Sequence, residues 1–459
     1  MLAAGFIICG VPLLSFFGMF FVQCGREYRR GRRVMFERLP DAGRPRQKAK
    51  LIPFRNYESP GASARRRRIV MGIAVAALVV AGGLKLRAQT AAPATASAAP
   101  ASSPWQYGGF LDAAYLVAPN DPANHLFRNR GTTFKVNEPV LDMAAAYIRK
   151  AAAPGSRWGA ELTVQAGEDA EVFGFSATAP KLAGADGLRH LGPTDVSYLA
   201  AVGKGLTIQG GIFSSLIGYD SLYAKDNFTY TRPWGADTTP YLMLGVNASY
   251  PFTEKVTATA FVVNGYWHLA DANRVPSSGG QLAYKATPHV TLKQTAMYGP
   301  HQPDTSLPLW RFLSDSIAEW KRDPVTVAFE YQLATEKVAA PGQPRAYWSA
   351  AQLPMHWVMD KSKHWSLTLR PEFAWDSDGR WTGFPQTIKA VTTTVEYRLP
   401  YRQTNSIFRV EYRHDDSRGA GGGFFENGHA GPGSERLTPT QNLVVFGLIL
   451  TFDGQIRRK

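Results

Sequence analysis

The stretch Tyr241–Gly265, YLMLGVNASYPFTEKVTATAFVVNG, predicts two β-strands joined by the turn Pro251–Glu254. Side chains of a strand alternate between its two faces. One face of the second strand is apolar and carries Val256, Ala258, Ala260 and Val262. The other face is polar and carries Thr257 and Thr259. Strands of about ten residues match the length of a tilted strand that crosses about 30 Å of hydrocarbon.

The same alternation continues along the chain from Trp105 to Phe452. Segments of alternating apolar residues are separated by connections, and short connections alternate with long ones. The number of strands predicted in this way is about sixteen, within a range of 12–18. Short turns at one end and long loops at the other are typical of outer-membrane barrels. No stretch after residue 104 approaches 18 consecutive apolar residues, which excludes an all-α membrane protein. The sequence therefore predicts an all-β, transmembrane, antiparallel up-and-down β-barrel.

Several later strands indicate which face meets lipid. Their apolar faces carry Val325, Val327, Leu367, Leu369, Phe408 and Val410. Their polar faces carry Glu330, Gln332, Arg370, Glu372, Arg409 and Glu411. A charged side chain costs about 2–4 kcal/mol near the bilayer midplane, so the polar faces are predicted to turn toward the inside of the barrel.

The basic excess of the chain lies at its front. The 459 residues carry a formal charge of +15, of which residues 1–88, with 17 Lys and Arg against four acidic residues, carry +13. The remaining +2 gives no reason to expect nucleic acid as a partner. Arg65–Arg68 followed by the apolar run Ile69–Gly83 predicts a secretory signal peptide over residues 65–88.

Residues 1–64 are predicted to be an N-terminal extension, for which two explanations stay open. The apolar Leu2–Val22 is either a membrane anchor ahead of the signal peptide or part of an extension from a misassigned start codon. The second explanation is favoured because an inner-membrane anchor would hinder the chain from reaching an outer membrane. Cys9 and Cys24 both lie in this extension, so the mature chain is predicted to lack cysteine, which suits an oxidising compartment.

The predicted mature chain has three parts. Residues 89–104 form an Ala/Pro/Ser linker, residues 105–452 the barrel, and residues 453–459 a short basic tail. The last strand, NLVVFGLILTF, has the form that the outer-membrane assembly machinery recognises, with Phe452 as its terminal aromatic residue. The predicted partners are this machinery, outer-membrane lipid and small solutes. A homotrimer is expected by analogy with sixteen-stranded porins.

Several short motifs resemble those of the OmpL-like β-barrel porin family. They are Phe110-x-Asp112-x-x-Tyr115, the run GIFSSLIGYDSLYAKDNFTYTR over residues 211–232, Gly245, and Val263-Asn264-Gly265 with Asp271 and Asn273. The resemblance covers residues 105–452. It implies a porin-like barrel of the bacterial outer membrane and does not identify a substrate.

The long connection 214–240 is predicted to fold into the lumen and to form a pore constriction. Acidic and basic side chains on opposite sides of a constriction create a transverse field that filters solutes by charge. The candidate constriction residues are Asp220, Lys225, Asp226, Arg232 and Asp237. The alternative is an external loop whose charges are solvated.

Late strands place several arginines on the polar face, where they are candidates for the basic side of the pore. These pore-lining candidates are Arg370, Arg398, Arg409 and Arg413. The alternative is that they form ion pairs within the wall, with Glu372, Glu396 and Glu411 as the available partners.

The favoured function is passive diffusion of small hydrophilic solutes, because about sixteen strands leave a water-filled lumen whereas eight do not. The alternative is a plugged structural or adhesive barrel that acts through its external loops. No histidine pair has metal-ligand spacing such as HExxH. We therefore expect no enzymatic activity, no catalytic residue, no metal and no cofactor.

We predict that the mature N-terminus lies near Gln89, because a small residue, Ala88, ends the predicted signal peptide. N-terminal sequencing of the protein purified from outer membranes checks this prediction. Recovery of an intact Met1 would show that the signal-peptide interpretation is wrong.

Overall fold

The computed structural model describes residues 103–173, 184–266, 269, 275–300, 309–340, 342–431 and 434–456. All of them belong to the compact unit Ile52–Lys459. The predicted extension, the signal peptide and most of the linker lie outside the described residues, as do residues 457–459 of the predicted tail.

Long strands make up the wall of the barrel. Their bounds are β1 Trp105–Val117, β2 Pro139–Lys150, β3 Trp158–Ala166, β4 Leu191–Ala200, β5 Leu206–Ser214, β6 Leu242–Pro251, β7 Val256–Val263, β8 Ser277–Lys285, β9 Val290–Pro300, β10 Trp310–Arg322, β11 Val325–Ala340, β12 Gln343–Gln352, β13 Met355–Val358, β14 Trp365–Asp376, β15 Gln386–Tyr401, β16 Thr404–Arg418 and β19 Thr440–Ile456.

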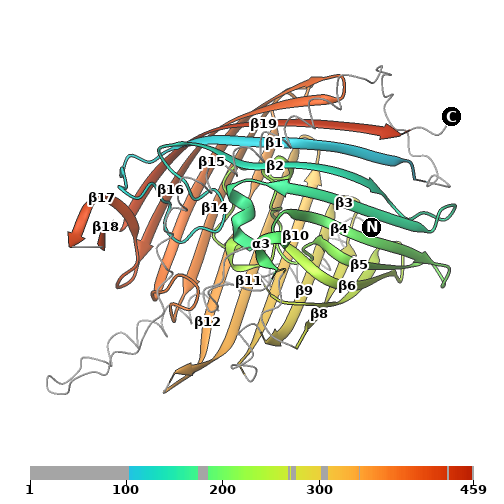
Figure 1. The fold of residues 1–459 in the computed structure, drawn as a ribbon, viewed down its shortest axis with the longest axis horizontal. Helices are drawn as coiled ribbons and strands as arrows, with labels where there is room; N and C mark the ends of the chain where they lie inside the picture. The colour runs from blue at the N-terminus through green and yellow to red at the C-terminus, as the bar shows by residue number, and fades with distance from the viewer. Residues whose placement is uncertain are drawn as a thin grey trace, which may run out of the picture. The chain divides into compact units, whose positions relative to one another are not determined.

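Neighbouring strands pair antiparallel, and β1 closes the barrel by pairing with both β2 and β19 (Figure 1). Closure removes the two edge strands that this sheet would otherwise have. β12 and β13 are two halves of one interrupted strand, because both lie between β11 and β14. The seventeen strands of this sheet thus form a closed barrel of sixteen. The predicted fold, strand number and antiparallel pairing are confirmed.

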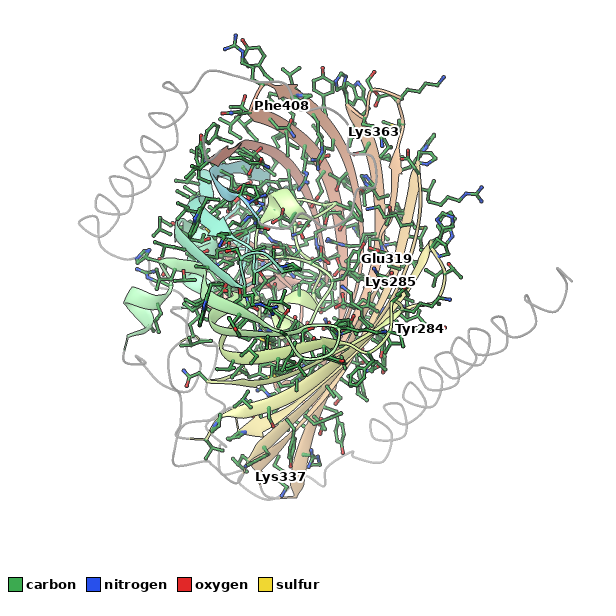
Figure 2. The ribbon with its side chains drawn as sticks, turned by 90° about the vertical axis from the view of Figure 1, so that its right-hand side faces the viewer. Tyr284, Lys285, Glu319, Lys337, Lys363 and Phe408 are labelled. Carbon is green, nitrogen blue, oxygen red and sulfur yellow. The ribbon has the colours of Figure 1, made fainter. Side chains whose placement is uncertain are left out.

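The two faces of the wall differ as the alternation predicts. On β16, Phe408 and Val410 are 46% and 51% exposed, whereas Arg409 and Glu411 are buried (Phe408 is labelled in Figure 2). The same holds on β14, where Leu369 is exposed and Arg370 is buried. The apolar side chains therefore face outward and the charged side chains face the interior.

Three segments differ from the alternation in the sequence, which predicts a strand over Thr132–Ile148, bent or interrupted at Pro139, and gaps between strands at residues 335–345 and 415–440. Residues 132–138, expected to be strand, precede β2, and the backbone N–H of Thr133 donates to Asp169 Oδ1 at 2.6 Å. The expected gap 335–345 is largely strand, because β11 runs to Ala340 and β12 begins at Gln343. The expected gap 415–440 contains the end of β16 and the hairpin of β17 (Phe424–Gly431) and β18 (Ser434–Thr438). Outside the hydrocarbon a strand does not need an apolar face, so the alternation does not mark its end.

The last strand also extends beyond the predicted terminal aromatic, Phe452. Residues 453–456, assigned to the tail from the sequence, continue β19 and pair with the first residues of β1. Asp453 lies opposite Gly108, and Ile456 lies opposite Trp105. Because β1 begins at Trp105, its first four residues provide pairing partners for residues 453–456.

The connections between strands are largely irregular. Those described include the short turns η1 (Glu168–Phe173), α3 (Ala185–Leu188), η2 (Ala224–Asp226) and η3 (Ala236–Thr238). Within the described part of the chain, no helix has the length and apolar character to cross a membrane. Residues of the connections, such as Phe127, Tyr230 and Trp234, form an apolar cluster with inward side chains of the wall, such as Leu116 and Ile449. The core of the protein therefore lies inside the barrel.

We predict that Ala260→Arg impairs barrel assembly. Ala260 faces outward near the middle of β7, where an arginine would cost about 2–4 kcal/mol in hydrocarbon. The matched control is Thr259→Arg, because Thr259 is the adjacent residue and its hydroxyl donates inside the barrel to Ser249 at 3.0 Å. Heat-dependent migration in gel electrophoresis measures the folded fraction of each variant. Equal folding of the two variants would contradict the assignment of the faces.

Candidate functional site

The connection between β5 and β6, residues 215–241, is here called the inner loop. Apart from η2 and η3 it has no regular secondary structure. Its residues 227–241 are almost all buried, and Tyr230 and Arg232 are 0% exposed. These side chains lie among inward-facing side chains of the wall, so the inner loop lies inside the barrel.

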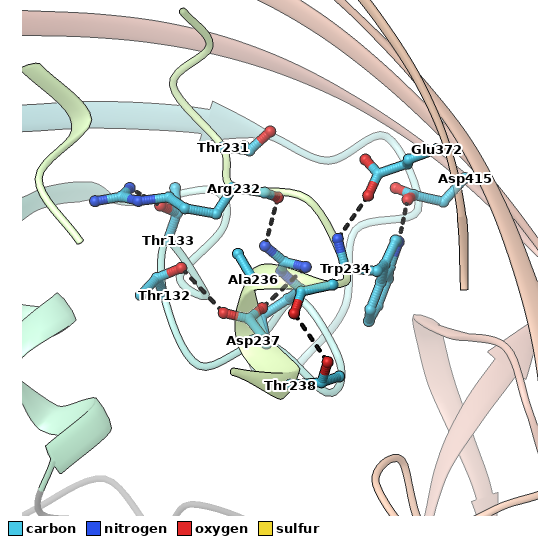
Figure 3. A network of polar contacts seen from close by, with 12 residues as sticks. Thr132, Thr133, Thr231, Arg232, Trp234, Ala236, Asp237, Thr238, Glu372 and Asp415 are labelled. Atoms are coloured by element: carbon cyan, nitrogen blue, oxygen red, sulfur yellow. Dashed lines mark hydrogen bonds and ion pairs between the residues drawn. The ribbon is translucent and has the colours of Figure 1, made fainter. Parts of the chain in front are cut away.

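Carboxylates of the wall accept hydrogen bonds from backbone N–H groups of the inner loop. Glu411 on β16 accepts from the N–H groups of Tyr230 and Thr231 at 2.6 and 3.0 Å. Glu372 on β14 accepts from the N–H group of Trp234 at 2.5 Å (Figure 3). These two carboxylates fix the middle of the loop against strands β14 and β16.

Arginines of the wall donate hydrogen bonds to backbone carbonyls of the same loop. Arg409 donates to the carbonyls of Ala224, Asn227 and Thr229 at 2.7, 2.5 and 3.0 Å. Arg370 donates to the carbonyl of Thr231 at 2.7 Å. Charge-assisted hydrogen bonds of this kind are stronger than those between neutral groups, so they hold an irregular backbone in one conformation.

The arginine candidates also form ion pairs within the wall. Arg409 binds Glu396 at 2.7 Å, and Arg413 binds Glu372 at 2.9 Å. Arg398 also binds Glu396, but its side chain is 39% exposed. Arg370 lies 3.4 Å from Glu372. Two of the three glutamates named from the sequence are thus partners of these arginines.

The inner loop also contacts the opposite part of the wall. Leu216 accepts hydrogen bonds from Gln281 on β8 and Thr295 on β9, at 2.6 and 3.0 Å. The Tyr219 hydroxyl donates to Glu319 on β10 at 2.7 Å. The loop therefore crosses the interior from one side of the barrel to the other.

The five loop candidates differ in their surroundings. Asp220 accepts from Gln352 at 2.6 Å. Asp237 pairs with Arg130 at 2.9 Å and Arg232 pairs with Asp169 at 2.9 Å, all with nearly fully buried side chains. Lys225 and Asp226 pair with each other, with 23% and 47% of their side chains exposed. Asp226 is the most exposed of the five, Lys225 and Asp220 are half-buried, and Arg232 and Asp237 are buried.

Two further connections take part in the site and were missed in the sequence. The segment 118–138 supplies Arg130 and Thr133, and Thr133 accepts from Arg232 at 2.9 Å. The segment after β3 supplies Asp169, the ion-pair partner of Arg232. Phe127, Phe134 and Val136 in the first segment were a usable signal, because an external loop rarely needs three large apolar residues in so short a stretch.

Burial perturbs the carboxyl groups of these loops. It raises the pKa of Asp169 to about 6, although the neighbouring Arg232 opposes this shift. Burial likewise raises the pKa of Asp237, against the influence of Arg130. The ionised forms of both residues thus depend on their arginine partners. Within the described part of the chain, no group of three or more His, Cys, Asp or Glu residues is placed to hold a metal ion.

Comparison with known proteins identifies the family of this chain. The model of the family described as "Putative beta-barrel porin-2, OmpL-like" matches residues 104–452. The chain belongs to this porin family. A search of curated proteins finds no match.

Three solved structures are among those to which this chain is similar. OmpF of Salmonella typhi, in complex with daunomycin, is 10% identical with a TM-score of 0.50 over 77% of this chain and 98% of that chain. The anion-selective porin of Comamonas acidovorans is 10% identical, with a TM-score of 0.48 over 76% of this chain and 100% of that chain. In-vitro folded OmpT of Vibrio cholerae is 10% identical, with a TM-score of 0.47 over 78% of this chain and 99% of that chain. The likeness to OmpF shows the fold alone.

Membership of this porin family places the protein in the bacterial outer membrane, as the sequence predicted. Barrels of this kind have their short turns on the periplasmic side and their long loops outside. Trp105 and Ile456 lie opposite each other at the end with the short turns, so this end is the periplasmic one. The inner loop enters the barrel from the external end.

We predict that Arg409→Ala lowers the free energy of unfolding by about 3–5 kcal/mol, because it leaves the buried Glu396 and three loop carbonyls without this partner. Arg398→Ala is the matched control, since Arg398 binds the same Glu396 from a partly exposed position, where a pair contributes about 0–1 kcal/mol. Urea unfolding in detergent measures both. Losses of equal size would contradict the anchoring role of Arg409.

Proposed function

We propose that the protein is a non-enzymatic porin for passive diffusion of small hydrophilic solutes, with a water-filled lumen narrowed by the inner loop. The observation that carries the proposal is a cavity of about 470 Å³ on the inner wall, at the periplasmic end of β1–β5. Its lining includes the charged side chains of Arg149, Glu161 and Asp195. In the water-filled lumen that we propose, these charged side chains are solvated.

These charges form a row across neighbouring strands. Arg149 on β2 lies directly opposite Glu161 on β3, which lies directly opposite Asp195 on β4. Basic and acidic groups are thus side by side on the surface that a solute would pass. Such an arrangement produces a local field that separates solutes by charge.

The proposed constriction is formed by the inner loop with its charged residues Asp220, Lys225, Asp226, Arg232 and Asp237. Within it, Lys225 and Asp226 are the charges that meet the solute, because Asp226 is the most exposed of the five and Lys225 pairs with it. Asp220, Arg232 and Asp237 hold the loop in place. Of the proposed pore-lining arginines, Arg398 faces solvent, while Arg370, Arg409 and Arg413 fix the loop to the wall.

The second candidate function is a plugged structural or adhesive barrel. It is favoured by the contacts of the inner loop with strands on both sides of the interior, from β8 to β16. Its external surface would include the hairpin β17–β18. In both cases the assembly machinery and lipid remain the predicted partners, and a homotrimer remains a prediction by analogy.

We predict stepwise conductance when the purified protein is added to planar lipid bilayers, because a diffusion pore needs a continuous path of water. Glu161→Gln should then make the channel more anion-selective, and Arg149→Gln should make it more cation-selective. The two variants are matched controls, since the residues are direct cross-strand partners in one cavity.

Reversal potentials under a salt gradient measure this selectivity, and the differences should fade as salt rises because exposed charges are screened. A barrel that folds but never conducts would favour the plugged alternative. Conductance with unchanged selectivity in both variants would show that solutes do not pass this cavity.

A further inference from the structure

Tyr230 of the inner loop occupies a slot in the wall where the barrel closes. The residue is fully buried, and its ring lies against Gly447 of β19. A Cβ atom at position 447 would lie 2.5 Å from Cδ2 of the ring. The absence of a side chain at Gly447 therefore creates the space that the ring fills.

The hydroxyl of Tyr230 meets two carboxyl groups at the end of this slot. Its oxygen lies 2.5 Å from Asp112 Oδ1 on β1 and 2.7 Å from Asp142 Oδ2 on β2. Both aspartates are buried, with 0% and 1% exposure. A phenolic hydroxyl has one proton to donate, so it can donate to one carboxylate only. If both aspartates were ionised, the second carboxylate would face a lone pair of the hydroxyl oxygen.

The hydroxyl itself stays protonated. Burial raises the pKa of Tyr230 well above its usual value, and the two nearby aspartates raise it further. The second short contact is therefore satisfied only when one of the two carboxyl groups carries a proton and donates it to the tyrosine oxygen. Two buried carboxyl groups that share one proton are the expected result when like charges lie this close together.

Other charged groups around the slot already have partners. Arg232 of the inner loop pairs with Asp169 of the segment after β3, and Arg409 of β16 pairs with Glu396 of β15. Glu411 of β16 accepts hydrogen bonds from the inner-loop backbone.

Arg232 attracts a negative charge on either aspartate, and Arg409 attracts one on Asp112. The residues of β19 nearest the slot, Val445, Gly447 and Ile449, carry no charge. A second negative charge would therefore have no cation of its own.

We propose that Tyr230 is the positioning residue of the inner loop, and that one proton shared by Asp112 and Asp142 through its hydroxyl holds the loop in the barrel. Loss of this proton places two carboxylates on one hydroxyl and releases this part of the loop. Release therefore increases as pH rises. The effect on conductance rests on the proposed porin function, whereas the position of the loop does not.

The position of the loop is tested first, by the reactivity of an added cysteine. Ala224→Cys is suitable because Ala224 is fully buried in the same apolar cluster as Tyr230, and the chain after Cys24 has no cysteine of its own. We expect slow reaction with a water-soluble maleimide at low pH and faster reaction as pH rises, relative to a free thiol measured at each pH. With Asp112→Asn in addition, the amide donates permanently to the tyrosine oxygen, so the rise with pH should be lost.

Gly447→Ala tests the slot without changing an ionisable group. The added methyl group should displace the ring and make the introduced cysteine reactive at every pH. Gly210→Ala is the matched control, since its Cβ would meet Val246 at an ordinary 3.7 Å and should leave the cysteine protected. Tyr230→Phe, which keeps the ring and removes the hydroxyl, should also increase reactivity. Heat-dependent gel migration confirms that each variant is folded.

Conductance in bilayers gives the second readout. It should rise with pH in the wild type, stay low in Asp112→Asn and be high in Gly447→Ala. If the wild type never conducts but labelling follows the expected pattern, the porin function fails and the anchoring of the loop by Tyr230 stands. Two results would overturn the proposal. One is a labelling rate of the Ala224→Cys protein that does not change with pH. The other is an equal labelling rate of that cysteine when Gly447→Ala or Gly210→Ala is added.

Discussion

The structure inside this barrel depends on hydrogen bonds between charged side chains of the wall and the backbone of the inner loop. A buried backbone group without a partner costs about 1–3 kcal/mol, and the loop has only two short turns to satisfy its own groups. Glu411 and Glu372 accept from its N–H groups, while Arg409 and Arg370 donate to its carbonyls. The side chains of the wall thus supply the hydrogen-bond partners that regular secondary structure supplies to the backbone elsewhere.

This arrangement separates two roles of charge on the inner face. Most arginines and glutamates of β14–β16 are buried and paired, so little of their charge is exposed to solvent. The charges that reach water include the Lys225–Asp226 pair, Arg149 of β2, Glu161 of β3 and, among the late strands, Arg398. The number of inward charges is therefore a poor guide to the charge that the interior of such a barrel presents to solvent. The charge that reaches solvent comes from those side chains that are not fully buried.

Lipid makes the wall predictable from the sequence, and the interior less so. Because hydrocarbon tolerates neither charges nor unpaired backbone, alternation such as that of Phe408 with Arg409 determines both the strand and its facing. The inner loop was predicted from the length and charges of its segment. Its partners were not, because Arg409 and Ala224 are separated by 185 residues and alternation does not encode which groups meet. Segment 118–138 was missed because Arg130 lies in a polar gap and Thr133 in a stretch that the alternation assigns to a strand, and neither residue indicates that Asp237 and Arg232 are its neighbours.

The position of Tyr230 links the inner loop to closure of the barrel. β1 and β19 lie at opposite ends of the folded chain, so their pairing closes the longest loop in sequence and carries the largest entropy cost of any strand pair. Tyr230 contacts β1 through Asp112, β2 through Asp142 and β19 through Gly447. Its slot exists only when these strands are joined, and the filled slot in turn stabilises their junction. By thermodynamic reciprocity, each process stabilises the other by the same free energy. The loop that shapes the interior is therefore also part of what holds the wall closed.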